Sequence, residues 1–155
     1  MVEFLSIDHI YSGGNKHIKQ LGGNGTAIYS WLIKNNFPHG FRTLCYNCNC
    51  SIGAYSYCPH HNAKSKEENR HSRVRIECIT YYGGKCDCCG ENQAEFLTID
   101  HINRNGAAHR KVVGFGNTFY YWLRRNNYPT GYRVLCYNCN IADGFYGKCP
   151  HVITG

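Results

Sequence analysis

The most constraining feature of the sequence is an internal repeat built around the hexapeptide Leu-Cys-Tyr-Asn-Cys-Asn, which occurs at residues 44–49 and again at 135–140. Each occurrence is preceded by Ile-Asp-His-Ile and followed by Cys-Pro-His. Chance does not produce the same motifs in the same order twice, so we interpret the chain as a tandem duplication. We call residues 4–60 copy 1 and residues 96–151 copy 2.

The repeat predicts two small domains joined by a linker. We place the first domain at residues 1–61 and the second at residues 74–155. The residues between them, 62–73, are polar and charged, which is typical of a linker. Each domain is too short to bury a large core, so we expect additional stabilisation from bound metal.

The second domain starts with a segment that copy 1 lacks. Val74 and Cys78 recur at helical spacing, and Gly83 follows where a helix could end. A Cys-x-x-Cys pair, Cys86 and Cys89, comes next, and the given sequence has no counterpart of it in copy 1. A second copy of the chain, as a homodimer, could supply the missing pair in trans.

Eleven cysteines in 155 residues leave two interpretations, a disulfide framework or metal binding. Their odd number and the Cys-x-x-Cys pairs favour metal. The first ten residues, MVEFLSIDHI, lack the features of a signal peptide, and no apolar run is long enough to span a bilayer. We therefore expect a cytoplasmic protein with no membrane partner, in the host cytoplasm if a phage encodes it.

The formal net charge of +7 predicts a polyanionic partner, most often a nucleic acid. The alternative is that this modest charge only aids solubility. Charge alone does not separate DNA from RNA.

Within copy 2 the pattern predicts an α+β unit. Residues 96–102 are apolar and β-branched and predict a short strand. The Gly- and Asn-rich residues 103–116 predict a loop, residues 118–126 a short helix, and residues 132–136 a second strand. A final helix is expected from Asn140 onward, with that residue as its N-cap.

Two Cys-x-x-Cys pairs predict a tetrahedral zinc site in copy 2, because each pair turns both sulfurs to one side of a tight loop. A second grouping is also open, in which a Cys-Pro-His motif supplies two ligands; it exists in both copies, and copy 1 could also borrow Cys50. The residues of the two-pair site are Cys86, Cys89, Cys136 and Cys139. The alternative groupings are Cys136, Cys139, Cys149 and His151 in copy 2, and Cys45, Cys48, Cys58 and His60 in copy 1.

The Asp100-His101 pair ends the first predicted strand and Asn140 directly follows the last cysteine pair. Carboxylate and amide oxygens suit Mg²⁺, and a histidine can accept a proton from water near neutral pH. These residues are chemically suited to metal-assisted phosphodiester hydrolysis. The alternative is an ordinary hydrogen-bonded Asp-His pair.

A Cys-x-x-Cys pair, a strand ending in Asp-His and a second pair followed by Asn resemble the zinc-containing His-Me finger (ββα-metal, HNH-type) nucleases, the branch of phage recombination endonuclease VII. The resemblance covers copy 2 and its preceding helix. It implies two tandem ββα-metal units, structural zinc, and catalytic Mg²⁺ or Mn²⁺ bound by Asp100 and Asn140, with His101 as general base. The matching residues of copy 1 are Asp8, His9 and Asn49.

The resemblance implies an endonuclease acting on double-stranded or branched DNA, of the homing, restriction or junction-resolving kind. The rival interpretation is a non-catalytic zinc-finger or assembly protein, which would not need Asp-His and Asn. Basic and histidine side chains near the expected cleft could contact phosphates. They are Arg104, His109, Arg110, Lys111, Arg124, Arg125 and Arg133. The alternatives are that the cations are solvated surface charges and that the histidine is a structural residue.

Overall fold

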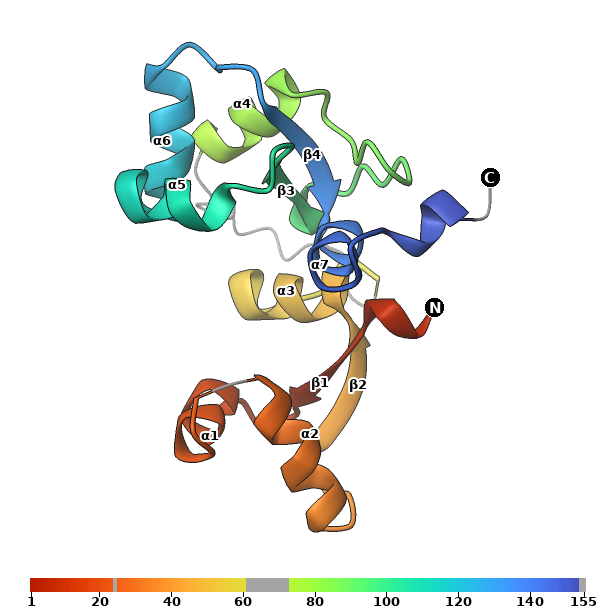
Figure 1. Cartoon of the computed structure of the whole chain (residues 1–155). Helices are drawn as coiled ribbons and strands as arrows, with labels where there is room; N and C mark the ends of the chain where they lie inside the picture. The colour runs from red at the N-terminus through yellow and green to blue at the C-terminus, as the bar shows by residue number, and fades with distance from the viewer. Residues whose placement is uncertain (24, 61–72, 154–155) are drawn as a thin grey trace. The chain divides into compact units, whose positions relative to one another are not determined.

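The computed structural model describes residues 1–23, 25–60 and 73–153, so the predicted linker at 62–73 lies outside them except for Arg73. Within these residues the chain is a small α+β protein with two separate antiparallel two-stranded sheets and seven α-helices (Figure 1). None of the helices in the described part of the chain is both long and apolar enough to cross a membrane.

Contacts divide the chain into two compact units, which do not coincide with the two copies of the repeat. Unit two is Leu5–Cys45, and unit one is Met1–Phe4 with Tyr46–Gly155. The strands of copy 1 therefore belong to unit two, whereas the helix that follows them belongs to unit one.

Unit two is a β-hairpin whose strands are connected through two helices. Leu5 lies opposite Cys45 and His9 opposite Phe41 in the antiparallel register. Ile28 and Leu32, one turn apart on the second helix, are its buried hydrophobic residues. The elements are β1 (Leu5–His9), α1 (Gly14–Gln20), α2 (Gly25–Lys34) and β2 (Phe41–Cys45).

Unit one contains the second hairpin, in the same register, with Leu97 opposite Cys136 and His101 opposite Tyr132. Its helices pack on that hairpin and on one another. The elements are η1 (Val2–Phe4), α3 (Tyr46–Tyr55), α4 (Arg73–Tyr81), η2 (Ala94–Phe96), β3 (Leu97–His101), α5 (Gly106–Val113), α6 (Asn117–Arg125), β4 (Tyr132–Cys136), α7 (Tyr137–Tyr146) and η3 (Pro150–Ile153).

Most elements predicted for copy 2 are confirmed, with two corrections. The segment 103–116 is not a continuous loop, because α5 occupies much of it. Helix α7 begins at Tyr137 rather than at Asn140. Its N-cap is Cys136, whose sulfur accepts a hydrogen bond from the backbone N–H of Cys139. A zinc-ligand candidate thus takes the capping role that was predicted for an asparagine.

Strand β3 separates its side chains by alternation. Leu97, Ile99 and His101 are buried on one face, whereas Asp100 points to the other. Helix α4 supports this strand through Arg75, a buried cation whose Nη2 donates hydrogen bonds to the carbonyl oxygens of Ala94 and Leu97. The strand that carries the Asp-His pair is therefore fixed from within the core.

Helices α3 and α7 occupy equivalent positions in the repeat and contact each other reciprocally inside unit one. The backbone N–H of Asn47 donates to Asn138 Oδ1 at 3.0 Å, and the backbone N–H of Asn138 donates to Asn47 Oδ1 at 2.9 Å. Each side chain thus satisfies a first-turn N–H of the other helix.

The Cys-Pro-His motifs of the two copies also make reciprocal contacts. The ring of His60 packs on Phe96 at 4.7 Å, and the ring of His151 packs on the equivalent Phe4 at 4.9 Å. Each copy therefore places its final histidine against the start of the other copy. Such reciprocal contacts are the pattern of an isologous interface, here formed within a single chain.

Candidate functional site

The two predicted cysteine pairs of copy 2 come together. One ligand atom from each of Cys86, Cys89, Cys136 and Cys139 lies within 4.8 Å of all the others. The loop that carries the first pair is tied to β4, because the backbone N–H of Asp87 donates to the Val134 carbonyl at 2.9 Å. The second pair lies where β4 passes into α7, so a metal ion bound here would join the loop to the hairpin.

A second group lies beside the first and shares Cys139 with it. It consists of Cys88, Cys139, Cys149 and His151, again with ligand atoms within 4.8 Å. The alternative grouping predicted from the sequence had Cys136 in place of Cys88. The run Cys-Asp-Cys-Cys at residues 86–89 held the signal for the additional ligand, because a single zinc site leaves one of its three cysteines unused.

The corresponding residues of copy 1 are brought together only in part. Cys48 Sγ lies 3.1 Å from His60 Nδ1 within unit one. Cys58 is buried in the same unit, and Cys45 is the last residue of β2 in unit two. The groups of cysteine and histidine side chains are therefore compatible with structural zinc, most completely in copy 2.

Proximity perturbs the thiols of this cluster. Hydrogen bonds from Cys136 and Cys139 lower the pKa of the Cys86 thiol, while burial raises the pKa of Cys88 to about 11. Zinc binds thiolates, so loading the site must release protons and its apparent affinity must fall with decreasing pH.

His101 is held in an aromatic and histidine cluster at the end of β3. Its exposed fraction is only 4%, and its ring stacks on Phe119. His101 Nε2 lies 2.9 Å from His109 Nδ1, so the two rings share one hydrogen bond. The His109 ring is in turn packed edge-on against Trp122, with centroids 4.4 Å apart. The contact with His109 orients the His101 ring, and the phosphate contact predicted for His109 stays a prediction.

The start of α5 closes over the other ring nitrogen of His101. A Cβ added to Gly106 would lie 2.9 Å from His101 Nδ1, so only glycine fits there without displacement. Burial lowers the pKa of His101, and the nearby His109 and Arg110 lower it further, whereas Asp100 opposes the shift. His101 is therefore neutral at neutral pH, the form in which it can accept a proton.

Asp100 lies on the opposite face of β3 and forms part of a chain of charges. Its Oδ2 accepts a hydrogen bond at 2.8 Å from Nε of Arg133, the residue opposite it on β4. Arg133 also contacts Asp143 at 3.3 Å, and Asp143 accepts a second contact at 3.0 Å from Arg104. Both carboxylates are thus paired with arginine.

Asp143 was not singled out from the sequence. It follows Asn140 by three residues on α7, a spacing that places both on one face of the helix, so helical periodicity was the available signal. Because α7 packs on β3 and β4, the helix presents an amide and a carboxylate on the side where Arg133 joins Asp143 to Asp100.

Copy 1 repeats the same local arrangement within unit two. His9 Nε2 lies 2.9 Å from His17 Nδ1, and the His17 ring packs edge-on against Trp31 at 4.5 Å. Asp8 Oδ2 accepts a hydrogen bond from Arg42 Nε at 2.8 Å. Asn49 lies on α3 in unit one.

The basic residues predicted near the cleft divide into two groups. Arg104 and Arg133 are paired with Asp143, and Arg124 lies 3.5 Å from Glu77 and over the ring of Tyr121. The remaining three cations, Arg110, Lys111 and Arg125, lie at exposed positions of α5 and α6.

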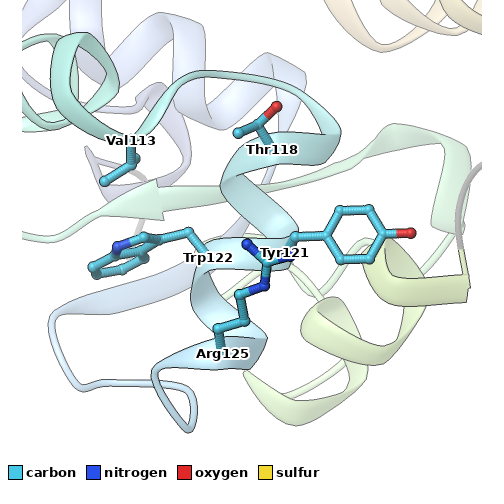
Figure 2. A pocket seen from close by; sticks show the side chains of 5 residues that line it. All are labelled: Val113, Thr118, Tyr121, Trp122 and Arg125. Carbon is cyan, nitrogen blue, oxygen red and sulfur yellow. The ribbon is translucent and has the colours of Figure 1, made fainter.

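A shallow pocket lies between these two helices (Figure 2). The Tyr121 ring extends away from the pocket side occupied by Trp122, and Arg125 follows one turn later. A half-exposed aromatic surface next to an exposed cation is suited to stacking a base beside a phosphate. The lining residues are Val113, Thr118, Tyr121, Trp122 and Arg125.

No family model, curated protein or solved structure matches the chain. The functional argument therefore depends on the geometry of the site.

Proposed function

We propose that the protein is a divalent-metal-dependent endonuclease that hydrolyses phosphodiester bonds of DNA, with copy 2 as its catalytic ββα-metal unit and copy 1 as a partner half. The observation that carries the proposal is the state of His101. It is buried, neutral, oriented by His109 and adjacent in sequence to Asp100. A purely structural hairpin has no need for a histidine pair in this setting.

His101 would act as the general base that accepts a proton from the attacking water. Asp100 and Asn140 offer hard oxygen donors of the kind that Mg²⁺ or Mn²⁺ prefers, and such an ion, when bound, stabilises the scissile phosphate and the leaving oxygen. Arg133 competes for the Asp100 carboxylate, so it must shift toward Asp143 or toward a substrate phosphate when Asp100 binds a cation.

Exposed Arg110 lies close to His101 and is the best-placed side chain to bind the phosphate next to the cleavage point. Lys111 and Arg125 would extend this contact along the backbone of DNA. Double-stranded and branched DNA are both compatible with these contacts, because phosphate binding does not read sequence.

One observation favours the rival function, a non-catalytic zinc-binding nucleic-acid or assembly protein. Asp100 and Asp8 are both paired with an arginine, as a structural carboxylate would be. In that case cysteine and basic residues would retain their roles, whereas His101 would serve only in packing.

Cleavage of supercoiled plasmid and of a four-way junction, with Mg²⁺, Mn²⁺ or EDTA, separates the two functions. The proposal predicts metal-dependent nicking that His101→Ala abolishes and His39→Ala, a change at an exposed histidine, leaves intact. Zinc content measured on the same samples shows that the variants are folded. DNA binding without cleavage in any divalent metal, at full zinc occupancy, would establish the rival.

A further inference from the structure

The two cysteine groups of copy 2 share one residue, Cys139. The number of metal ions they can hold therefore depends on whether its thiolate binds one ion or two. We propose that residues 86–89 and 136–151 bind two zinc ions, bridged by the thiolate of Cys139. One ion would be held by Cys86, Cys89, Cys136 and Cys139. The other would be held by Cys139, Cys88, Cys149 and His151.

The ligand count fits two ions. Two tetrahedral zinc ions need eight ligand positions, and seven residues fill them when a single thiolate bridges. A thiolate has lone pairs for two metals, whereas the imidazole of His151 serves one ion through Nδ1. Separate sites would leave one ion with three protein ligands, and a single site would leave three of the seven residues unused.

The distances between ligand atoms also fit. Bonds of about 2.3 Å to sulfur and about 2.0–2.1 Å to nitrogen give tetrahedral edges of about 3.8 Å between sulfurs and about 3.6 Å between sulfur and nitrogen. Cys89 Sγ and Cys136 Sγ are 3.8 Å apart. His151 Nδ1 lies 3.6 Å from Cys149 Sγ and 3.3 Å from Cys139 Sγ. These pairs of ligand atoms, one in the first group and two in the second, therefore already have separations close to those of a zinc site.

Burial and charge agree with a bridge at Cys139. The exposed fraction of Cys139, which belongs to both groups, is 0%, and Cys149 is also buried at 4%. Six thiolates with two Zn²⁺ and a neutral imidazole leave a net charge of about −2. Lys148 lines the pocket that Cys88, Cys139 and Cys149 also line, so its ammonium group can offset part of this charge.

The second ion would have a distinct mechanical role. His151 packs on Phe4, the residue that opens copy 1, and the start of the chain contacts α7. The second zinc would therefore fix η3 and the N-terminal segment to the hairpin, whereas the first fixes only the hairpin itself. This inference does not depend on whether the chain cleaves DNA.

Reconstitution of the full chain with ¹¹³Cd tests the bridge directly. We expect two ¹¹³Cd resonances that couple to each other through the shared sulfur, whatever else copy 1 binds. Cys149→Ser and Cys88→Ser should each lower zinc per chain by one and remove the coupling, leaving one uncoupled resonance from the other site.

Cys50→Ser is the matched control, because Cys50 belongs to none of the groups of metal-binding geometry among the described residues. It should change neither the zinc content nor the coupling. The proposal is overturned if ¹¹³Cd gives no coupled pair, or if Cys88→Ser and Cys149→Ser bind as much zinc as the unaltered chain. Because the coupling is measured on the unaltered chain, a variant that fails to fold does not affect this result.

Discussion

The two copies of the repeat build the same histidine cluster in different surroundings. In both, the histidine at the end of the first strand contacts a second histidine at 2.9 Å, which packs against a tryptophan. In copy 2 that first histidine is buried at 4% exposure, whereas His9 in copy 1 is half-buried. The local sequence is thus sufficient to form the cluster, and additional structure is needed to enclose it.

Four features distinguish copy 2 and the segment before it from copy 1. Helix α4 and the Cys86–Cys89 pair precede its hairpin, and Asp143 and Arg104 stand where copy 1 has Ile52 and Ser12. Arg104 and Asp143 belong to the charge chain on the Asp100 side of β3, whereas α4 packs on β3 and α6. Both copies therefore have the histidine cluster and an Asp-Arg pair, whereas among the described residues only copy 2 has the longer charge chain and four-residue groups of metal-binding geometry.

The largest expected difference between the copies concerns Cys136 and its equivalent, Cys45. Cys136→Ser removes a candidate zinc ligand, whereas the serine hydroxyl can still cap α7. Structural zinc contributes about 10 kcal/mol or more to folding in small domains. We expect zinc per chain to fall by one and unit one to lose its cooperative unfolding transition, as measured by zinc content and circular dichroism. Cys45→Ser should retain both, and equal damage from the two substitutions would contradict the comparison.

The next effect concerns the glycines that face the two histidines. A Cβ at residue 106 would lie 2.9 Å from His101 Nδ1, and one at residue 14 would lie 3.0 Å from His9 Nδ1. Because His101 is enclosed, we expect Gly106→Ala to destabilise its cluster by about 1–3 kcal/mol, despite the better helix propensity of alanine.

His9 is freer to move, so Gly14→Ala should change stability by less than about 1 kcal/mol. Fluorescence of Trp122 in a Trp31→Phe background, and of Trp31 in a Trp122→Phe background, reports unfolding near each cluster during urea titration. If Gly14→Ala destabilised the protein more than Gly106→Ala, the argument from the burial of His101 would be wrong.

Features that depend on neighbouring residues could be predicted from the sequence, whereas features that depend on contacts between different elements could not. Local signals were sufficient for the bounds of β4, the spacing of the zinc ligands and the length of α6. Helix α5 was missed because Gly and Asn are frequent where it begins, although the residues of its last turns are compatible with a helix. The sequence left open whether His109 is a structural or a functional residue, and its contacts with His101 and Trp122 depend on how α5 and α6 pack.

The charge chain from Asp100 through Arg133 to Asp143 could not be predicted for the same reason. It joins β3, β4 and α7, and its existence depends on the strand register. The sharing of Cys139 between two groups likewise depends on where η3 returns to the hairpin. Composition and spacing identify the candidate metal ligands, but only the fold shows which of them lie together in one group.

A smaller effect is expected at the reciprocal contact between α3 and α7. Asn47→Ala and Asn138→Ala each leave one first-turn N–H without its side-chain acceptor, which we expect to cost about 1–2 kcal/mol. Because the contact is symmetric, the two losses should be similar in thermal melts of the zinc-loaded chain. Losses that differ several-fold would show that the two helices are not equivalent partners.

The smallest effect is expected from single surface charges. Arg110 stands where copy 1 has Ile18, so Arg110→Ile gives copy 2 the residue of copy 1. DNA affinity should fall a few-fold, and the slope of log affinity against log salt should decrease by about one. Fluorescence anisotropy at several salt concentrations measures both, and an unchanged slope would place Arg110 outside the DNA contact.

The most direct test of the account compares His101→Ala with His9→Ala in plasmid cleavage with Mg²⁺, at matched zinc content. The account predicts that His101→Ala abolishes strand cleavage, whereas His9→Ala retains nicking at a rate close to that of the unaltered chain. If His9→Ala abolishes cleavage and His101→Ala does not, the assignment of catalysis to copy 2 is wrong.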